Sequence, residues 1–159
     1  MFIGIVGLLL VACNSNPNGY KIQGNVANAG NGIAILSLPA GRSEFVVLDT
    51  VPMKKGVFVF SGTLEAPALV AIQIIPKGEA SAYVSLFAEN KPIRITADWN
   101  NVIDRYGYRS IQEVKVEGSR NHSVSERLSG VSDEMKKKPE FKAYAEVEER
   151  LGKLRETDR

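Results

Sequence analysis

Short runs of apolar and β-branched residues recur at intervals of about ten positions through residues 20–118, and no other feature constrains the fold as strongly. Gly, Pro, Asn and Asp separate the runs, as they do in turns between strands. The pattern predicts a mainly β fold, an antiparallel β-sandwich of about eight or nine strands. Its clearest runs are YKIQGNV (20–26), IAILSL (33–38), EFVVLDTV (44–51), ALVAIQII (68–75), AYVSLFAE (82–89), IRITAD (93–98) and EVKVEG (113–118).

The stretch VPMKKGVFVFSG (51–62) has the form of a β-hairpin with its turn at Gly56. Asp49 precedes this hairpin, and Glu89 and Asn90 stand between two later strands. Asp and Asn hydrogen-bond turn backbone, and glycine readily adopts positive φ. We interpret these four residues as structural turn residues.

Residues 119–159 form a charged segment with 10 Lys or Arg and 9 Asp or Glu after Ser119. Apolar residues recur there at spacings of three and four, which predicts two amphipathic helices interrupted at Pro139. Ser123 and Glu126 have the spacing of a capping box for the first helix. The apolar positions are Val124, Leu128, Val131, Met135, Phe141, Tyr144, Val147, Leu151 and Leu154.

Residues 2–12 are uninterrupted apolar residues or glycine, too few to span a bilayer but of the length of a signal-peptide core. The run ends in LVAC, which looks like a bacterial lipobox, so we predict a lipoprotein signal peptide over 1–12 and lipidation of Cys13. Residues 13–19 would be the lipidated cysteine and a polar tether. The alternative is that Cys13 is a small buried residue of an N-terminal strand. No Lys or Arg precedes the apolar run, which is a departure from signal peptides.

Other chemistry has little support in the residue pattern. The net charge of +2 and the lack of a basic, aromatic patch argue against nucleic acid as a partner. No Cys and His group has the spacing of a zinc site, and no metal or cofactor is predicted. His122 is the only histidine, and a solvated or capping role suits its charged surroundings better than a general base. The serines near it in sequence are Ser119, Ser123 and Ser125.

A carboxylate-based hydrolase is an alternative that rests on Glu89 and Asp98, which flank one predicted hairpin, and on Asp49, which precedes another. A glycosidase needs two such groups facing one cleft, about 5 to 10 Å apart. Nothing in the sequence places these carboxylates together. We therefore prefer the interpretation that Asp49 and Glu89 bind turn backbone.

The aromatic residues Trp99, Tyr106 and Tyr108 cluster in DWNNVIDRYGYRS (98–110), which we interpret as a polar, irregular stretch between strands. Exposed aromatics among Asn, Asp and Arg are typical of a carbohydrate- or protein-binding surface. The alternative is that Trp99 closes one end of the sandwich core while the tyrosines cover its edge.

Three stretches carry a resemblance to a known family. The family is domain of unknown function 4369. Its aspartate-led hairpin is similar to VLDTVPMKKGVFVFSGTLEAP (47–67), and its Glu-Asn turn between two strands is similar to FAENKPIRI (87–95). The start of its closing helix resembles VEGSRNHSVSERL (116–128), which contains Gly118 and Ser119. That β-rich domain occurs in Gram-negative lipoproteins. The resemblance implies a lipobox before the domain, and a helical connector and a thioredoxin-like redox domain after it.

The sequence departs from that family architecture, because the chain ends at Arg159 without a Cys-x-x-Cys motif. Thiol-disulfide exchange needs a free thiolate, and lipidation of Cys13 would leave none. The missing basic residues before the apolar run and the missing redox domain suggest an incomplete reading frame.

From these observations we predict a cell-envelope module, lipid-anchored, periplasm-facing and without catalysis of its own. It would bind or position another component, or be the N-terminal remnant of a thioredoxin-like lipoprotein. Its domains would be 1–12, 13–19, 20–118 and 119–159. The alternatives are an accessory domain that docks a separate thioredoxin-like partner through 119–159, and the carboxylate-based hydrolase. Two partners are therefore expected: the membrane, through the lipid anchor, and a protein, through 119–159.

Overall fold

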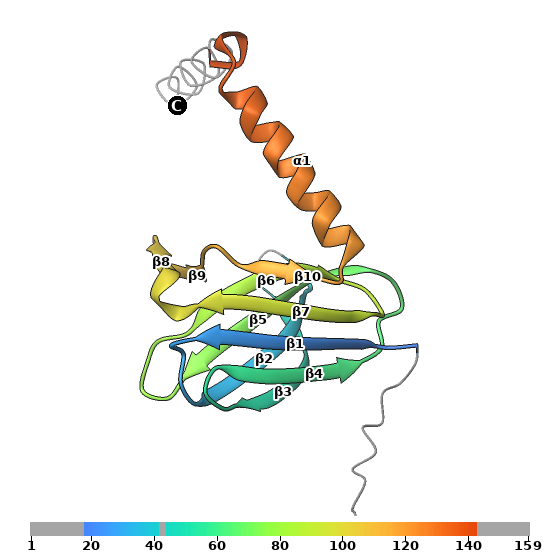
Figure 1. Ribbon diagram of the computed structural model, residues 1–159, viewed down its shortest axis with the longest axis vertical. Helices are drawn as coiled ribbons and strands as arrows, with labels where there is room; N and C mark the ends of the chain where they lie inside the picture. The colour runs from blue at the N-terminus through green and yellow to red at the C-terminus, as the bar shows by residue number, and fades with distance from the viewer. Residues whose placement is uncertain (1–17, 42–43, 143–159) are drawn as a thin grey trace, which may run out of the picture.

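A computed structural model describes residues 18–41 and 44–142, and shows two facing β-sheets from which a helix projects (Figure 1). Sheet A has the strand order β10-β7-β1-β4, and sheet B has the order β3-β2-β5-β6-β9-β8. The predicted mainly β sandwich is therefore confirmed. The strands are β1 (Tyr20–Ala27), β2 (Gly32–Pro39), β3 (Phe45–Met53), β4 (Val57–Gly62), β5 (Ala68–Pro76), β6 (Ala82–Ala88), β7 (Pro92–Asp98), β8 (Val102–Arg105), β9 (Tyr108–Ile111) and β10 (Lys115–Glu117).

The core lies between the two sheets, where alternate side chains of each strand point inward. In β1, β4 and β7 every second residue is buried, because successive strand residues face opposite sides of the sheet. The ring of Phe58 on β4 occupies the space that a Cβ at Gly24 of β1 would need, so only glycine fits at this position without a shift of the ring. The largest fully buried side chains are Phe60, Ile22, Leu36, Met53, Ile72, Ile74, Leu86, Ile95, Val26 and Val70.

The prediction that all strands are antiparallel is wrong, because both sheets are mixed. β1 pairs with β7 in parallel over the whole length of β7, and β6 and β9 form a short parallel contact. Parallel neighbours need a long connection between them, and β2 to β6 supply it for β1 and β7. The alternation of side chains is the same in both arrangements, so the sequence pattern does not distinguish them.

The predicted hairpin over 51–62 is correct only at its turn. Lys54 and Val57 form a β-bridge around Lys55 and Gly56, both of which have positive φ. Beyond that bridge the strands separate, because β3 belongs to sheet B and β4 to sheet A. The stretch is therefore a corner that carries the chain from one sheet to the other.

The stretch 98–110 is not irregular as predicted. After a short 3-10 helix, η1 (Trp99–Asn101), strands β8 and β9 pair as an antiparallel hairpin around a two-residue turn at Tyr106 and Gly107. The hairpin lies at the edge of sheet B and raises the strand number to ten among the described residues.

The first predicted C-terminal helix is α1 (Arg120–Lys136), and helical backbone resumes at Pro139. Ser119 is its N-cap, so the predicted capping box at Ser123 and Glu126 is wrong. Most of the second predicted helix, together with residues 1–17, which include Cys13, lies outside the described residues. Among the helices that the structure describes, none has the length and apolar character needed to cross a membrane.

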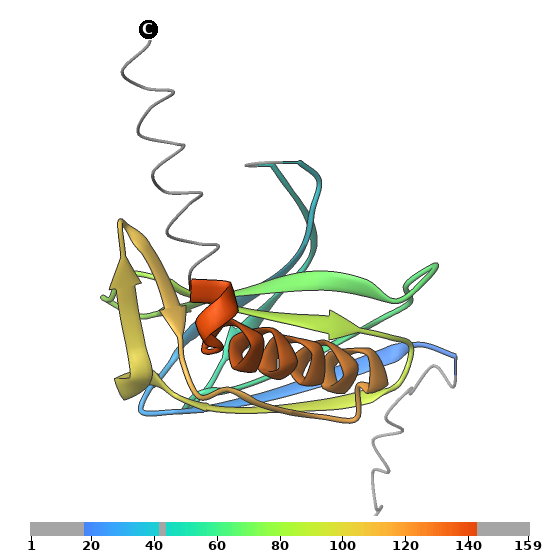
Figure 2. The same cartoon turned by 90° about the horizontal axis from the view of Figure 1, so that it is seen from above.

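Two edge hairpins of sheet B project from the same side of the sandwich (Figure 2). The ends of β2 and β3 extend beyond β5 and β6, and the tip of the β8–β9 hairpin extends in the same direction. A register shift opposite Leu36 and Ser37 marks a β-bulge in this part of β3. Bulges bend a strand and increase its twist, which accounts for the outward curve of the arm.

Candidate functional site

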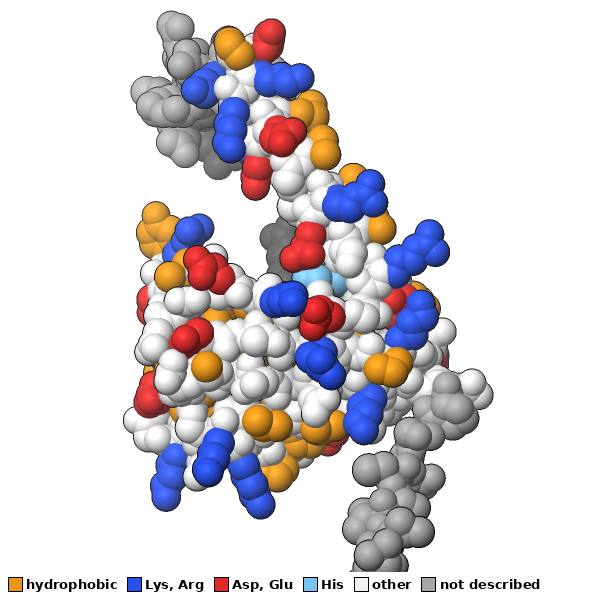
Figure 3. Space-filling view, in the orientation of Figure 1, with side chains coloured by type: hydrophobic (Ala, Val, Ile, Leu, Met, Phe, Trp, Pro, Cys, Tyr) orange, Lys and Arg blue, Asp and Glu red, His pale blue; other side chains and the backbone are white. Residues whose placement is uncertain are grey.

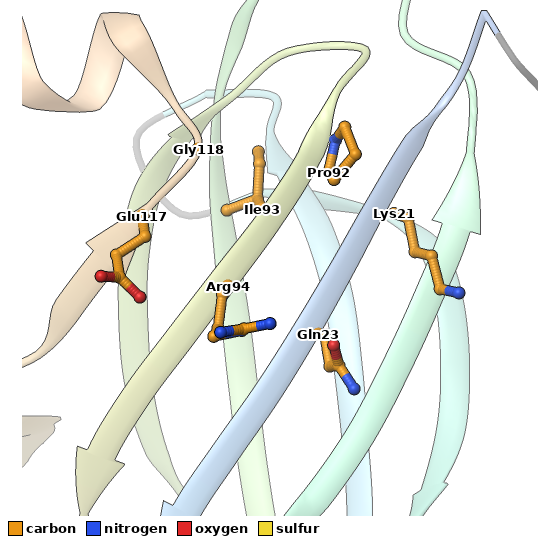
Figure 4. A pocket seen from close by; sticks show the side chains of 7 residues that line it. All are labelled: Lys21, Gln23, Pro92, Ile93, Arg94, Glu117 and Gly118. Atoms are coloured by element: carbon orange, nitrogen blue, oxygen red, sulfur yellow. The ribbon is translucent and has the colours of Figure 1, made fainter.

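A shallow polar groove crosses the outer face of sheet A (Figure 4). Its volume is about 470 Å³. β1 contributes Lys21 and Gln23, β7 contributes Arg94, and β10 contributes Glu117, all pointing outward because they alternate with core residues. The parallel register places Arg94 beside Gln23, and the antiparallel register places it opposite Glu117.

The groove has an excess of positive charge. Glu117 binds Lys115 at 2.9 Å, and that hydrogen bond, more than the charges of Lys115 and Arg94, lowers the pKa of the Glu117 carboxyl. The side chains of Lys21 and Arg94 form no hydrogen bond or ion pair within the described part of the chain. These two cations remain available for an anionic group on a ligand.

A second groove, of about 600 Å³, lies where three turns meet beside the outer face of sheet B. Its walls include the apolar side chains of Ile33, Pro52 and Ile75, and Lys54 and Lys77 stand at its border. The turns are tied together by hydrogen bonds: the backbone N–H of Lys77 donates to the Asn31 carbonyl at 2.8 Å. The backbone N–H of Lys55, in the third turn, donates to the side-chain oxygen of Asn31 at 2.9 Å. The backbone and the side chain of Asn31 thus hold the groove in shape.

The predicted aromatic surface is divided by the structure. Trp99 is buried, as the alternative interpretation expected, and its indole N–H donates to the Glu79 carboxylate at 2.6 Å. The guanidinium of Arg109 stacks on its ring at 5.8 Å from the centroid. Trp99 therefore closes the core, and only the two tyrosines remain as surface groups.

Tyr106 lies in the turn of the β8–β9 hairpin, Tyr108 follows the turn, and both are exposed. Tyr108 stacks on Tyr83 of β6, with ring centroids 5.5 Å apart and planes 11° from parallel. Tyr106 has φ of 56° and is fully exposed. A tight hairpin turn usually has Asn, Asp or Gly at this left-handed position, so a tyrosine there is unusual.

Glu89 and Ser119 attach α1 to the sandwich. The Glu89 carboxylate accepts the backbone N–H of Arg120 at 2.6 Å and the side-chain amide of Asn121 at 3.1 Å. The Ser119 hydroxyl donates to the Phe87 carbonyl at 2.7 Å and accepts the His122 N–H at 3.0 Å. A carboxylate and an N-cap at the same helix start both satisfy its free N–H groups.

Replacing Ser119 with alanine is expected to loosen the base of α1 and to lower the free energy of unfolding by about 1 to 2 kcal/mol, the usual cost of losing an N-cap. Ser119 is almost fully buried, and the variant would leave the Phe87 carbonyl without this partner. Amide hydrogen exchange should accelerate in the first turn of α1. Ser132→Ala, at an exposed position of the same helix, is the matched control, and equal exchange in both variants would contradict the assignment.

Asn90 and Gly118 serve the same end of the domain. The Asn90 side chain accepts the N–H of Leu64 at 2.8 Å and donates to its carbonyl at 2.7 Å, which fixes the connection between β4 and β5. Gly118 has φ of 91°, and a Cβ there would overlap the Pro92 carbonyl. Together with Glu89, these residues hold the β4–β5, β6–β7 and β10–α1 connections side by side at the base of α1.

Asp49 lies inside β3, near the bulge, and not in a turn as predicted. Its carboxylate accepts the N–H of Thr50 at 2.7 Å. Burial, and secondarily the charge of Asp49, raise the pKa of the Tyr20 phenol. Asp49 therefore acts on local backbone and on a core residue.

The structure does not bring the candidate catalytic groups together. Glu89 and Asp98 lie at opposite ends of β7, whose seven residues span roughly 20 Å, well beyond the spacing of a glycosidase pair. Asp98 caps η1, and hydrogen bonds from the Asn28 amide and the Asn100 N–H lower the pKa of its carboxyl. His122 lies 3.6 Å from Glu126 on α1. Within the described residues no His, Cys, Asp and Glu group has the arrangement of a metal site.

Comparison with protein families identifies the β domain. The family model described as Domain of unknown function (DUF4369) matches residues 20–124, well over half of the chain. The chain belongs to this family. The matched range of DUF4369 covers both sheets and reaches into the first turns of α1, so the helix base built on Glu89 and Ser119 is part of the family domain. No curated protein and no solved structure matched the chain.

Sequence reasoning missed both grooves of this DUF4369 domain. Lys21 and Arg94 are far apart in sequence and become neighbours only through the parallel pairing of β1 and β7. The projecting arm had a signal that could have been used: FVVL (45–48) is a run of consecutive apolar residues, and all four are exposed. A half-buried strand would instead alternate.

Proposed function

We propose that this protein is a lipid-anchored module of the cell envelope that binds or positions another component and has no catalysis of its own. The LVAC motif at Cys13 and the apolar run before it support the anchor. Membership of DUF4369 supports the comparison with the Gram-negative lipoproteins that this domain resembles. We propose a periplasm-facing position, because no acidic residue follows Cys13 directly.

The observation that carries the proposal is the exposed apolar stripe of α1. Val124, Leu128, Val131 and Met135 are all exposed, and a line of hydrophobic side chains follows one side of the helix (Figure 3). No residue of α1 is buried. Isolated helices of this length are marginal in water, and amphipathic helices gain most of their stability from packing. Among the described residues, α1 is held at its base and its apolar side is exposed, which suits it to positioning a partner.

The anchor is tested by metabolic labelling with radioactive palmitate in a Gram-negative host. We expect the wild-type chain to be labelled and to float with membranes, and Cys13→Ala to be unlabelled. Ser15→Ala, at another position in the tether, should be labelled like the wild type. An unlabelled wild type, or an equally labelled Cys13→Ala variant, would refute the lipid anchor.

A second candidate function is docking of a separate thioredoxin-like redox protein through 119–159. It is favoured by the same stripe, because a helix side of four apolar residues fits an apolar groove on a partner. The partner would supply the Cys-x-x-Cys chemistry that this chain lacks. The carboxylate-based hydrolase has no comparable observation in its favour, because Glu89 and Asp98 are at opposite ends of β7.

The two functions are separated by a pull-down from envelope extract with the wild type and with Leu128→Glu. Docking predicts that a thioredoxin-fold protein is recovered with the wild type and lost with Leu128→Glu. Asp133→Lys, which changes charge away from the stripe, is the control and should retain the partner. Recovery of no thioredoxin-fold protein would count against this second function and leave the first.

A further inference from the structure

The outer face of sheet B has a projecting hairpin at each edge of the sheet (Figure 2). Its floor is formed by β2, β5 and β6, and includes Ile33, Ile35 and Ile75, which point away from the core. Ile33 is exposed, and the other two are half-buried. These three positions are apolar, whereas Gln73 of β5 and Ser85 of β6 are polar positions of the same outer face.

The arm formed by β2 and β3 is apolar on both of its faces. Phe45, Val46, Val47 and Leu48 are consecutive and exposed, with between about a third and three fifths of each side chain accessible. Successive strand residues point to opposite sides, so no single flat partner could cover all four. An apolar medium that surrounds the arm would cover both sides.

The tip of the second hairpin projects on the same side of the molecule (Figure 2), and Tyr106 in its turn and Tyr108 directly after the turn are both exposed. Tyrosine is enriched at membrane–water interfaces, where its ring contacts acyl chains and its hydroxyl remains hydrated. At φ of 56°, Tyr106 occupies a position where Asn, Asp or Gly would be less strained. Strained residues that are fully exposed are found at binding sites.

Positive charge borders this face. Lys54 and Lys77 line the apolar groove at its end, and Lys55 lies in the adjoining turn. None of the three lysines forms an ion pair within the described residues. Among the acidic groups on this side, Glu79 is bound by the indole of Trp99, Asp104 accepts the N–H of Gly107, and Glu44 is exposed directly before Phe45 of the arm. Unpaired lysines around an apolar surface complement anionic headgroups above acyl chains.

We propose that the outer face of sheet B rests on an anionic lipid bilayer, with the β2–β3 arm and the β8–β9 tip inserted at the interface. This inference rests on the proposed lipid anchor, which would hold the domain beside that surface. The seven residues from Cys13 to Gly19 join the proposed anchor to β1 and can span at most about 25 Å. This reach is close to the length of β1, so the anchor would hold the domain within about one strand length of the lipid surface.

The outer face of sheet A, with its polar groove, would then face away from the lipid. A protein partner is the other possible occupant of the sheet B face, but it would have to cover a floor, both sides of an arm and a separate hairpin tip. A lipid interface contacts all three without a matching shape. The three lysines at the border, which have no ion pair among the described residues, favour anionic headgroups further.

The test places a polarity-sensitive nitrobenzoxadiazole label at single introduced cysteines of the lipidated full-length chain. Lipidation leaves no other thiol, because Cys13 is the only cysteine. Val47→Cys reports on the arm, and Thr96→Cys, an exposed position on the outer face of sheet A, is the matched control. In vesicles of equal parts phosphatidylcholine and phosphatidylglycerol, we expect the Val47 label to brighten and to be quenched by brominated acyl chains, and the Thr96 label to do neither.

Flotation of the same samples reports on the anchor separately. Protein that floats while both labels stay equally hydrated would overturn this inference and leave the anchor intact, whereas protein that does not float would overturn the anchor. Shielding of Val47 that requires an added protein would assign the face to a protein partner and overturn the inference as well.

A charge variant tests the role of the lysines. Each lysine near an anionic surface is worth about a fivefold change in equilibrium constant, so Lys54→Gln, Lys55→Gln and Lys77→Gln together should reduce the equilibrium constant for docking on the order of a hundredfold. Lys115→Gln with Lys137→Gln, at exposed positions of β10 and at the end of α1, should leave it unchanged. Equal docking of both variants would contradict the electrostatic part of the inference.

Discussion

Gly56→Ala is expected to lower the free energy of unfolding by about 3 to 5 kcal/mol, a large part of the stability of a domain of this size. Gly56 has φ of 78°, and a Cβ there would overlap the carbonyl oxygen of Val26. Its N–H donates to Gly30 at 2.6 Å, and its carbonyl accepts the Val26 N–H at 2.9 Å. Moving the corner away from β1 would break these bonds, at about 1 kcal/mol each, in addition to the cost of a left-handed alanine.

Gly78→Ala is the matched control for this prediction. Gly78 has φ of 83°, but no other atom lies within 4 Å of the position that its Cβ would take. It should therefore show only the backbone cost, about 1 to 2 kcal/mol. Urea unfolding followed by circular dichroism measures both variants. Equal losses would mean that the close approach of Gly56 to β1 is unimportant and that left-handed backbone alone accounts for the effect.

The sequence predicted the strands well because their signal is local. The alternation of β1, β4 and β7 and the turn residues between strands are visible within a few positions, and so is the interruption of the helices at Pro139. The same information does not say which strand lies beside which. The antiparallel prediction failed for that reason, since β1 and β7 are brought together by a connection of many residues.

The corner at Gly56 shows the same limit on a smaller scale. A tight turn between two apolar runs is typical of a hairpin, and the turn is present. Whether the strands stay paired beyond it depends on which sheet buries each of them. Phe58 and Phe60 pack from sheet A onto a core shared with Met53 of sheet B. That preference arises from the assembled core and has no counterpart in the turn sequence.

Candidate functional residues were harder to predict than strands. Trp99 and Tyr106 belong to one polar stretch, but one is buried against Glu79 and the other is fully exposed. From the sequence, Glu89 was a candidate catalytic or turn residue. In the structure its carboxylate accepts the N–H of Arg120, 31 residues later, and thereby holds the start of α1. Such roles depend on contacts between distant segments, which a single sequence does not display.

Phe60→Ala is expected to cost about 3 to 5 kcal/mol, the usual loss for removing a buried phenylalanine side chain. Phe60 is fully buried, and its ring lies 5.5 Å from that of Phe58, at an angle of 58°. Both rings point inward from β4, so the variant would open a cavity between the sheets. The loss should appear as a lower midpoint of urea unfolding with an unchanged slope.

Val59→Ala separates this core effect from a general weakening of β4. Val59 is the neighbour of Phe60 in the strand, but it points to the outer face of sheet A and is 38% exposed. Its truncation should cost less than about 1 kcal/mol, because it removes only a partly buried group. In a hairpin within one sheet, Met53 and Phe60 would lie in the same sheet. In this structure they pack toward each other from opposite sheets. A large loss for Val59→Ala together with a small one for Phe60→Ala would contradict the assignment of β4 to sheet A with this orientation.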